Sequence, residues 1–286
     1  MLFQGSSAFS LASILALAAG QAAPAGHEYI PPGPNDVRSP CPGINSAANH
    51  VCYIPRSGKN ITPLQVAQGL KEGLNVGLDF GLVVGQGATV SNPNPLAGTF
   101  NMDQLRAHNF PIEHDVSLSR QDFYQGSNLN FNQDIFNQVL AFYEGMERTS
   151  LPVAMHAQWA RVDRQRQLNG DKLIYGPRQL VLGLVESSLY QSVMGNPITG
   201  EAPISYVRSF FEQERLPYEL GWTKPAVETN FATLGIMANN MLLTDPGEFG
   251  EQLPELTGDL VQDVFQLRDP LTGTLVNATC ALLGRC

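Results

Sequence analysis

Glycine recurs at every fourth position between residues 69 and 85 of this chain, at Gly69, Gly73, Gly77, Gly81 and Gly85. Thr62-Pro63 comes shortly before, and a threonine cap followed by a first-turn proline predicts that a helix begins there. A four-residue spacing would place the glycines on one slowly rotating helix face. Each interior glycine costs about 1 kcal/mol of helix stability relative to alanine, so the bare face must serve a close contact. A second helix or a flat ligand would fit, and a helix-on-helix contact is the favoured interpretation.

Most other apolar residues follow the period of a helix rather than that of a strand. Periodic or capped segments predict helices over 130–143, 176–195, 205–214 and 231–243. The Asn-Gly pair within 168–174 predicts a small hairpin, and roughly the last 40 residues are weakly specified. The sequence therefore predicts an all-α fold, a mainly helical single domain over residues 23–286 with at most a small hairpin.

The N-terminal residues 1–22 have the pattern of a secretory signal peptide. They carry no charged side chain, contain an apolar stretch over 9–19 and end in small residues suited to cleavage near Ala22. The stretch is too short and too rich in Ser and Ala to span a membrane. We therefore expect a secreted protein, on which the sequons at Asn60 and Asn277 would accept glycans.

The charge balance argues against two classes of partner. The chain has 286 residues, with 17 Lys and Arg against 26 Asp and Glu, which gives a formal net charge of −9. Nucleic-acid binding depends on basic side chains that neutralise phosphates, and the sequence offers no surplus of them. Neither nucleic acid nor an anionic membrane is an expected partner.

A single acidic residue, Glu186, interrupts the predicted helix over 176–195. Helical spacing places Glu186 on one face with Leu182, Leu189 and Tyr190. A carboxylate on an apolar face must be paired, solvated in a cavity or kept partly neutral by a raised pKa. A proton shuttle and a salt bridge to an arginine of another helix are therefore both open interpretations.

A second candidate site is the stretch EHDVSLSRQD, residues 113–122. Glu113 and Ser117 are four residues apart and can face one way, and a carboxylate with a hydroxyl suits Mg²⁺ or Mn²⁺. The alternative is a solvated acidic turn. Ser119 and Asp122 have the spacing of a capping box, which predicts that a helix begins there.

The stretch RSPCPGIN places Cys41 between two prolines. Four cysteines in an exported chain would ordinarily favour disulfides. Cys280 and Cys286 would then close a small loop, whereas Cys52 is expected on the helix after Cys41 as a buried hydrophobe. An intermolecular disulfide, and with it a homodimer, is the open alternative.

Four segments together resemble one known family: SPCPGINSAANHVCYIPRSG, EHDVSLSRQDFY, YGPRQLVLGLVES and SVMGNPITGEAPISYVRSFFEQERLPYELGW. The family is that of the fungal haem-thiolate peroxidases, the chloroperoxidases and unspecific peroxygenases, particularly its shorter members. The likeness covers roughly residues 39–222. It implies a haem b cofactor and hydrogen peroxide as oxidant, with a ferryl intermediate that oxygenates or oxidises small hydrophobic or aromatic substrates, or halides.

The resemblance also implies roles for five residues. Cys41 would be the axial thiolate ligand of the haem iron, Glu186 the distal acid-base group and His114 its assistant. Glu113, the main-chain carbonyl of His114 and the hydroxyl of Ser117 match the family's Mg²⁺ or Mn²⁺ site beside a haem propionate. Two alternatives to a broad peroxygenase remain, a pathway-specific peroxidase of fungal secondary metabolism and a non-catalytic haem-binding protein.

Elementary chemistry explains why such a ligand would have proline on both sides. The prolines stiffen the chain and lack amide protons, and a helix beginning near Asn45 would point its free N–H groups back at the sulfur. Those dipoles favour a thiolate over a thiol. An electron-rich thiolate in turn promotes cleavage of the O–O bond.

Overall fold

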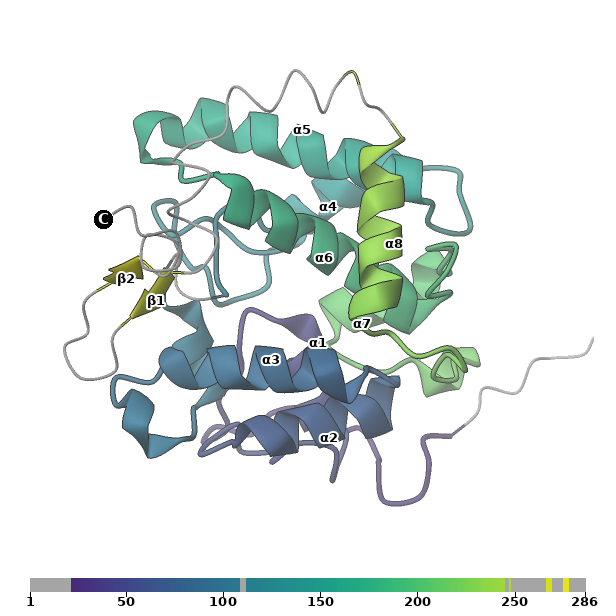
Figure 1. Ribbon diagram of the computed structural model, residues 1–286. Coiled ribbons are helices and arrows are strands. Elements are labelled where there is room, and N and C mark those ends of the chain that lie inside the picture. The colour runs from purple at the N-terminus through teal and green to yellow at the C-terminus, as the bar shows by residue number, and fades with distance from the viewer. Residues whose placement is uncertain (1–21, 109–111, 245–246, 248–265, 269–274, 278–286) are drawn as a thin grey trace, which may run out of the picture.

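The computed structural model describes residues 22–108, 112–244 and 247, together with 266–268 and 275–277. These residues form eight α-helices and one short antiparallel pairing, of β1 (Gln266–Arg268) with β2 (Leu275–Asn277) (Figure 1). The predicted all-α class is confirmed. In the described part of the chain, no helix combines the length and the apolar character needed to cross a membrane. Apart from its last residue, the predicted signal peptide lies outside the described residues, as do Cys280 and Cys286.

The glycine run forms two helices, so the prediction of a single helix face is wrong. α2 (Pro63–Leu74) begins as predicted, with the Thr62 hydroxyl accepting the Gln65 N–H and the Gln65 side chain accepting the Thr62 N–H. It ends at Asn75, which adopts the left-handed conformation at φ 54°. The Asn75 side-chain amide donates to the carbonyl of Pro225 at 2.9 Å, which holds the chain in this turn before α3 (Leu78–Val90) begins.

The glycines of α3 allow its backbone to lie directly against α2. A Cβ atom on Gly81 would be 2.9 Å from the Cα of Ala67, and one on Gly85 would be 2.8 Å from the Cα of Pro63. The favoured interpretation, a close helix-on-helix contact, is confirmed for these two positions. Gly69 and Gly73 of α2 instead accommodate the backbone and ring of Tyr53.

Six further α-helices complete the described fold: α1 (Pro42–Asn49), α4 (Gln133–Leu140), α5 (Leu151–Asn169), α6 (Pro177–Met194), α7 (Ile204–Glu212) and α8 (Phe231–Leu242). The predicted helix over 176–195 is confirmed almost to the residue, because Gly176 and Gly195 are its two caps. The helices predicted over 130–143, 205–214 and 231–243 correspond to α4 with a following 3₁₀ turn, α7 and α8. α5 had no sequence prediction.

Two local predictions are wrong, each for a visible reason. The Asn-Gly pair at 169–170 does not make a hairpin, because Gly170, at φ 53°, caps the end of α5 and donates its N–H to Arg166. No helix begins at Ser119. The carboxylate of Asp122 accepts the backbone N–H of Val116 at 2.9 Å and the side-chain amide of Asn169 at 2.6 Å, so it closes the preceding loop instead.

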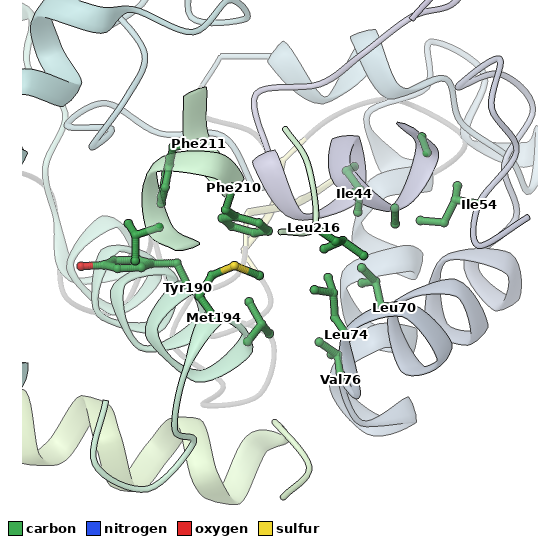
Figure 2. Close-up of a cluster of buried hydrophobic side chains, with 14 of the residues drawn as sticks. Ile44, Ile54, Leu70, Leu74, Val76, Tyr190, Met194, Phe210, Phe211 and Leu216 are labelled. Carbon is green, nitrogen blue, oxygen red and sulfur yellow. The ribbon is translucent and has the colours of Figure 1, made fainter. Parts of the chain in front are cut away.

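Two hydrophobic clusters meet at α6. The first joins side chains of four helices in one cluster: Ile44 of α1, Leu70 and Leu74 of α2, Tyr190 and Met194 of α6, and Phe210 and Phe211 of α7 (Figure 2). In the second, the other half of α6 packs with α5 and α8. Figure 1 shows the α2–α3 pair at one end of the molecule and α5, α6 and α8 at the other. Because α6 belongs to both clusters, the position of its single acid, Glu186, is fixed by the core.

We predict that Gly85→Ala lowers the free energy of unfolding by about 1–3 kcal/mol, because its methyl group would overlap the backbone of Pro63. Gly235→Ala is the matched control. Gly235 lies within α8 with no atom within 4 Å of its virtual Cβ, so alanine there should raise the stability by up to about 1 kcal/mol. Urea unfolding of both variants measures the difference, and equal effects would contradict the α2–α3 contact.

Candidate active site

Cys41 is the N-cap residue of α1, which begins at Pro42 rather than near Asn45 as expected. Burial raises the pKa of the Cys41 thiol, while the backbone N–H groups of Ile44 and Gly43 hydrogen-bond to the sulfur and lower it. The predicted amides therefore point at the sulfur, but burial outweighs them and the thiol pKa stays above its ordinary value. A bound metal ion would reverse this balance, because coordination deprotonates a thiol.

Cys52 differs from its prediction in two ways. It is exposed rather than buried, and it lies in a turn beyond α1 with φ 72°. The helix ends at Asn49 because His50 takes an extended conformation and its Nε2 accepts the N–H of Leu216 at 3.1 Å. Cys41 and Cys52 are both free cysteines.

Glu186 and His114, more than 70 residues apart in the sequence, meet in the structure. The Nε2 atom of His114 lies 3.4 Å from Oε1 of Glu186, and the two side chains are 2% and 48% exposed. The Nδ1 atom of His114 bonds to the carbonyl of Asp115, which turns Nε2 toward the carboxylate. The structure therefore pairs Glu186 with a histidine rather than with the arginine of the salt-bridge alternative.

The pair is electrostatically strong because one partner is enclosed. Burial would lower the pKa of His114, but the charge of Glu186 and the bond to it raise the pKa to about 9. The imidazole is therefore a cation at neutral pH, held against a half-exposed carboxylate. Glu186 also acts at a distance on Cys41, raising the pKa of that thiol, so the pair and the sulfur lie within electrostatic reach of each other.

The loop containing Glu113 is buried, which makes the solvated acidic turn a wrong interpretation. Glu113 is 9% exposed and Asp115 is 1% exposed. The carboxylate of Glu113 accepts from the side-chain amide of Asn128 at 2.8 Å and lies 3.1 Å from Nδ1 of His108. Burial and the charge of Asp122 raise the pKa of Asp115 to about 6.

Ser117 lies at a tight turn of the same loop. Its hydroxyl oxygen accepts the backbone N–H groups of Ser119 at 3.2 Å and Arg120 at 3.1 Å, and its carbonyl accepts from the guanidinium of Arg161 at 3.1 Å. Within the described residues, no three His, Cys, Asp or Glu side chains gather as a metal-binding cluster. A cation at this loop would therefore need a mixed set of carboxylate, carbonyl and hydroxyl oxygens.

An ion pair, Arg120 with Glu214, had no sequence prediction. Arg120 is 1% exposed, and its Nη2 lies 2.7 Å from Oε1 of Glu214. Arg120 lowers the pKa of the Cys41 thiol, so it also lies within electrostatic reach of the sulfur. The sequence did contain one indication of a role for Arg120. It is the basic residue within the acidic motif EHDVSLSRQD, where an arginine is expected to pair with a carboxylate.

Comparison with known proteins identifies the family. The family model described as peroxidase, family 2, matches residues 27–227. The chain belongs to this family. An aromatic peroxygenase from Coprinellus radians is 27% identical over an alignment of 215 residues, and the match covers 68% of this chain and 81% of the relative. A chloroperoxidase from Leptoxyphium fumago is 29% identical over an alignment of 231 residues, and the match covers 72% of this chain and 60% of the relative.

A third relative in peroxidase family 2 is a dothistromin biosynthesis peroxidase from Dothistroma septosporum. It is 36% identical over an alignment of 137 residues, and the match covers 40% of this chain and 32% of the relative. The chain thus spans less than two thirds of the length of two of these three proteins. Membership confirms the predicted resemblance to the fungal haem-thiolate peroxidases, with haem as the cofactor and peroxide-dependent oxidation as the class of reaction.

The described residues fit a haem. Cys41 offers a sulfur at a helix N-terminus with two amide donors directed at it, which is an environment that favours a thiolate ligand. Gly43 leaves room beside that sulfur, since a Cβ there would be 3.7 Å from the Sγ of Cys41 and 3.7 Å from the ring of Phe210. The acid pair of His114 and Glu186 lies within electrostatic reach of the same atom.

The raised pKa of His114 predicts a pH-dependent contribution to stability. The folded pKa of about 9 lies above the ordinary 6.5, so the protonated pair stabilises the fold fully below about pH 6.5 and its contribution is lost as the pH rises through about 9. We expect the free energy of unfolding to fall over this range in the parent protein and to fall less in Glu186→Gln. Urea titrations at several pH values measure both slopes, and parallel slopes would contradict the ion pair.

Proposed function

We propose that this chain is a secreted haem-thiolate peroxygenase that uses hydrogen peroxide to oxygenate or oxidise small hydrophobic organic substrates, with halides as a second substrate class. One observation carries the proposal. Cys41 presents its sulfur at the start of α1 under two backbone amides, within electrostatic reach of a histidine–glutamate pair. An oxidation that needs both a thiolate ligand and a mobile proton requires this combination.

Haem, when bound, supplies the iron at which peroxide is activated. Cys41 would ligate that iron, and the amides of Gly43 and Ile44 would limit the negative charge on its sulfur. A more electron-rich thiolate favours O–O cleavage, so these two hydrogen bonds would balance reactivity against stability of the ligand.

Glu186 has the position and exposure of a proton shuttle. Its carboxylate would take a proton from one oxygen of hydrogen peroxide and return it to the other, so that water leaves. Because the carboxylate is 48% exposed, it can approach a small molecule, whereas His114 is enclosed and 2% exposed. His114 would therefore hold the carboxylate in place while it takes and returns the proton.

Several observations support apolar substrates. Leu182 and Leu189 flank Glu186 on α6 and are only partly buried. Partly exposed apolar side chains beside a reacting acid favour hydrophobic ligands. Two relatives carry the names aromatic peroxygenase and chloroperoxidase, which agree with aromatic substrates and halides respectively.

A pathway-specific peroxidase of secondary metabolism is the second candidate, supported by the similarity to the dothistromin biosynthesis peroxidase. Turnover of a panel of small aromatics compared with turnover of one native metabolite would separate the two candidates. Comparable rates across the panel would favour the broad peroxygenase. A non-catalytic haem-binding protein is disfavoured because it would have no use for the acid pair of Glu186 and His114.

We further propose that Mg²⁺ or Mn²⁺ binds through Glu113, the carbonyl of His114 and the hydroxyl of Ser117, beside a haem propionate. The burial of Glu113 supports this proposal, because an anionic side chain inside the protein needs compensating charge. His108 and Asn128 hold the carboxylate and would act as outer partners of the ion.

Secretion after removal of residues 1–22 is also proposed, with Asn60 as a glycan acceptor. Asn60 is exposed and has φ 55° in a surface turn, which suits an acceptor site. Mass spectrometry of the protein from culture medium would give the N-terminus and the glycan mass.

A homodimer linked through Cys52, an exposed free thiol, is also proposed for the secreted protein. Gel electrophoresis with and without reductant tests it.

Replacing the ligand should remove the haem chemistry. We predict that Cys41→Ala abolishes the thiolate-type absorption spectrum of the ferrous carbonyl form and all peroxide-dependent oxygen transfer. Cys52→Ala is the matched control and should leave both unchanged, because Cys52 is exposed in a turn beyond α1. An unchanged spectrum in Cys41→Ala would place the ligand elsewhere.

Replacing the proton shuttle should leave the haem in place. Glu186→Gln keeps the volume and shape of the side chain but cannot cycle a proton, so the rate of reaction with peroxide should fall by about 100-fold or more. His114→Ala should cause a smaller loss, and Glu201→Gln, an exposed acid beyond α6, should cause none. Stopped-flow absorption measures the rates, and a parent-like rate in Glu186→Gln would remove the catalytic assignment.

Removing the metal ligand should affect retention more than chemistry. We predict that Glu113→Ala lowers the content of Mg²⁺ or Mn²⁺ and the fraction of protein that retains haem, because the ion would tether a propionate. Glu144→Ala, at an exposed acid, serves as the control. Elemental analysis and haem absorbance measure the two quantities, and equal metal content in Glu113→Ala and parent would exclude the site.

A further inference from the structure

A polar network lies behind the Cys41 loop, on residues that the proposed chemistry does not use. The Oδ1 atom of Asn45 accepts from the backbone N–H of Ser39 at 2.8 Å and from its hydroxyl at 2.9 Å. The hydroxyl of Ser39 in turn accepts the backbone N–H of Cys41 at 3.1 Å. Ser39 and Asn45 are buried, at 1% and 0% exposure, so these bonds have no competition from water and fix the turn that carries the sulfur.

Glu214 connects this network to the buried arginine. Its Oε1 atom accepts from the side-chain amide of Asn45 at 2.7 Å and from Nη2 of Arg120 at 2.7 Å. The Glu214 residue itself adopts φ 48°, a conformation that costs a non-glycine residue free energy. Its carbonyl accepts from the side-chain amide of Asn49 at 3.1 Å. The strained backbone and the shared oxygen together bring one carboxylate against both α1 and the loop of Arg120.

Arg120 acts electrostatically on both Glu214 and the Cys41 sulfur. The side chains of Arg120 and Glu214 are 2% and 19% exposed, so their charges are poorly screened by solvent. Burial lowers the pKa of the Arg120 guanidinium, and the charges of Glu214 and Cys41 raise it. The guanidinium would therefore stabilise negative charge on the Cys41 sulfur to a degree that depends on how far Glu214 neutralises it.

We propose that Arg120 and Glu214 are positioning residues that set the electron-donating strength of the Cys41 thiolate. Glu214 holds the cysteine loop through Asn45 and cancels part of the charge that Arg120 directs at the sulfur. This inference rests on the proposed function, because it takes Cys41 as the ligand of the haem iron.

The charge-setting role gives opposite signs for the two partners. Reduction of the iron adds one negative charge to the site, so a nearby positive charge favours the reduced state. Glu214→Gln leaves the charge of Arg120 uncompensated and should raise the midpoint potential of the haem. Arg120→Gln leaves Glu214 uncompensated and should lower it. If the pair only held the structure together, the two variants would not shift the midpoint potential in opposite directions, because loss of either partner would loosen the same contact.

Spectroelectrochemical titration of the haem-loaded protein provides the test. We expect the equilibrium constant for reduction to change about tenfold upward in Glu214→Gln and about tenfold downward in Arg120→Gln, about 59 mV each for a one-electron couple. The double variant should return toward the parent potential, and Arg120→Lys, which keeps the charge, should stay close to it. Glu219→Gln is the matched control, because it breaks the 3.2 Å pair with Arg215 in the neighbouring segment and should leave the potential unchanged.

The outcomes separate the inference from the function on which it rests. Potentials that move in the same direction in Glu214→Gln and Arg120→Gln, or that do not move, would overturn the inference while a thiolate-type carbonyl spectrum persists. A parent protein without that spectrum would overturn the proposed function as well. Should Arg120→Gln fail to fold, Glu214→Gln and Arg120→Lys still decide, because only the first should raise the potential.

Discussion

The short helix α1 is held by hydrogen bonds from its polar side chains to neighbouring segments as well as by apolar packing. All of its residues from Gly43 to Asn49 are buried, and a buried polar group without a partner costs about 1–3 kcal/mol. The side chain of Asn45 accepts a hydrogen bond from the backbone N–H of Ser39 and donates one to the carboxylate of Glu214. The side-chain oxygen of Asn49 accepts from the guanidinium of Arg38 at 2.8 Å. The segments that supply these partners are therefore held against α1, and the sulfur at its start acquires a fixed surrounding.

Much of the fold follows from local signals in the sequence. The Gly176-Pro177 pair and Gly195 mark the ends of α6, and the amphipathic spacing of Ile135, Phe136 and Val139 predicts α4. α5 gives no comparable signal because it buries polar residues, Gln158, Arg161 and Gln165 among them, and so lacks an apolar stripe. The break at Asn75 was equally invisible, since its left-handed turn is held by a carbonyl about 150 residues further along.

The candidate site shows the same division between local and long-range information. Sequence motifs identified Cys41, His114 and Glu186, and the structure brings the last two together and places Glu186 within electrostatic reach of Cys41. The Arg120–Glu214 pair joins residues 94 apart, and no spacing rule predicts such a contact. The capping-box prediction at Asp122 failed because a loop residue with φ 73°, Val116, needed the same carboxylate.

The unequal enclosure of the acid pair determines how hydrogen isotopes enter the site. The Nε2 atom of His114 is shielded from solvent, and its other ring nitrogen is bonded to the carbonyl of Asp115. Glu186, by contrast, is 48% exposed. After transfer to heavy water, a deuteron would reach the imidazole by way of the Glu186 carboxylate, since the carboxylate contacts both the solvent and the Nε2 atom of the ring. The rate at which the ring exchanges its proton therefore reports on the motions of Glu186, even though the histidine itself stays in place.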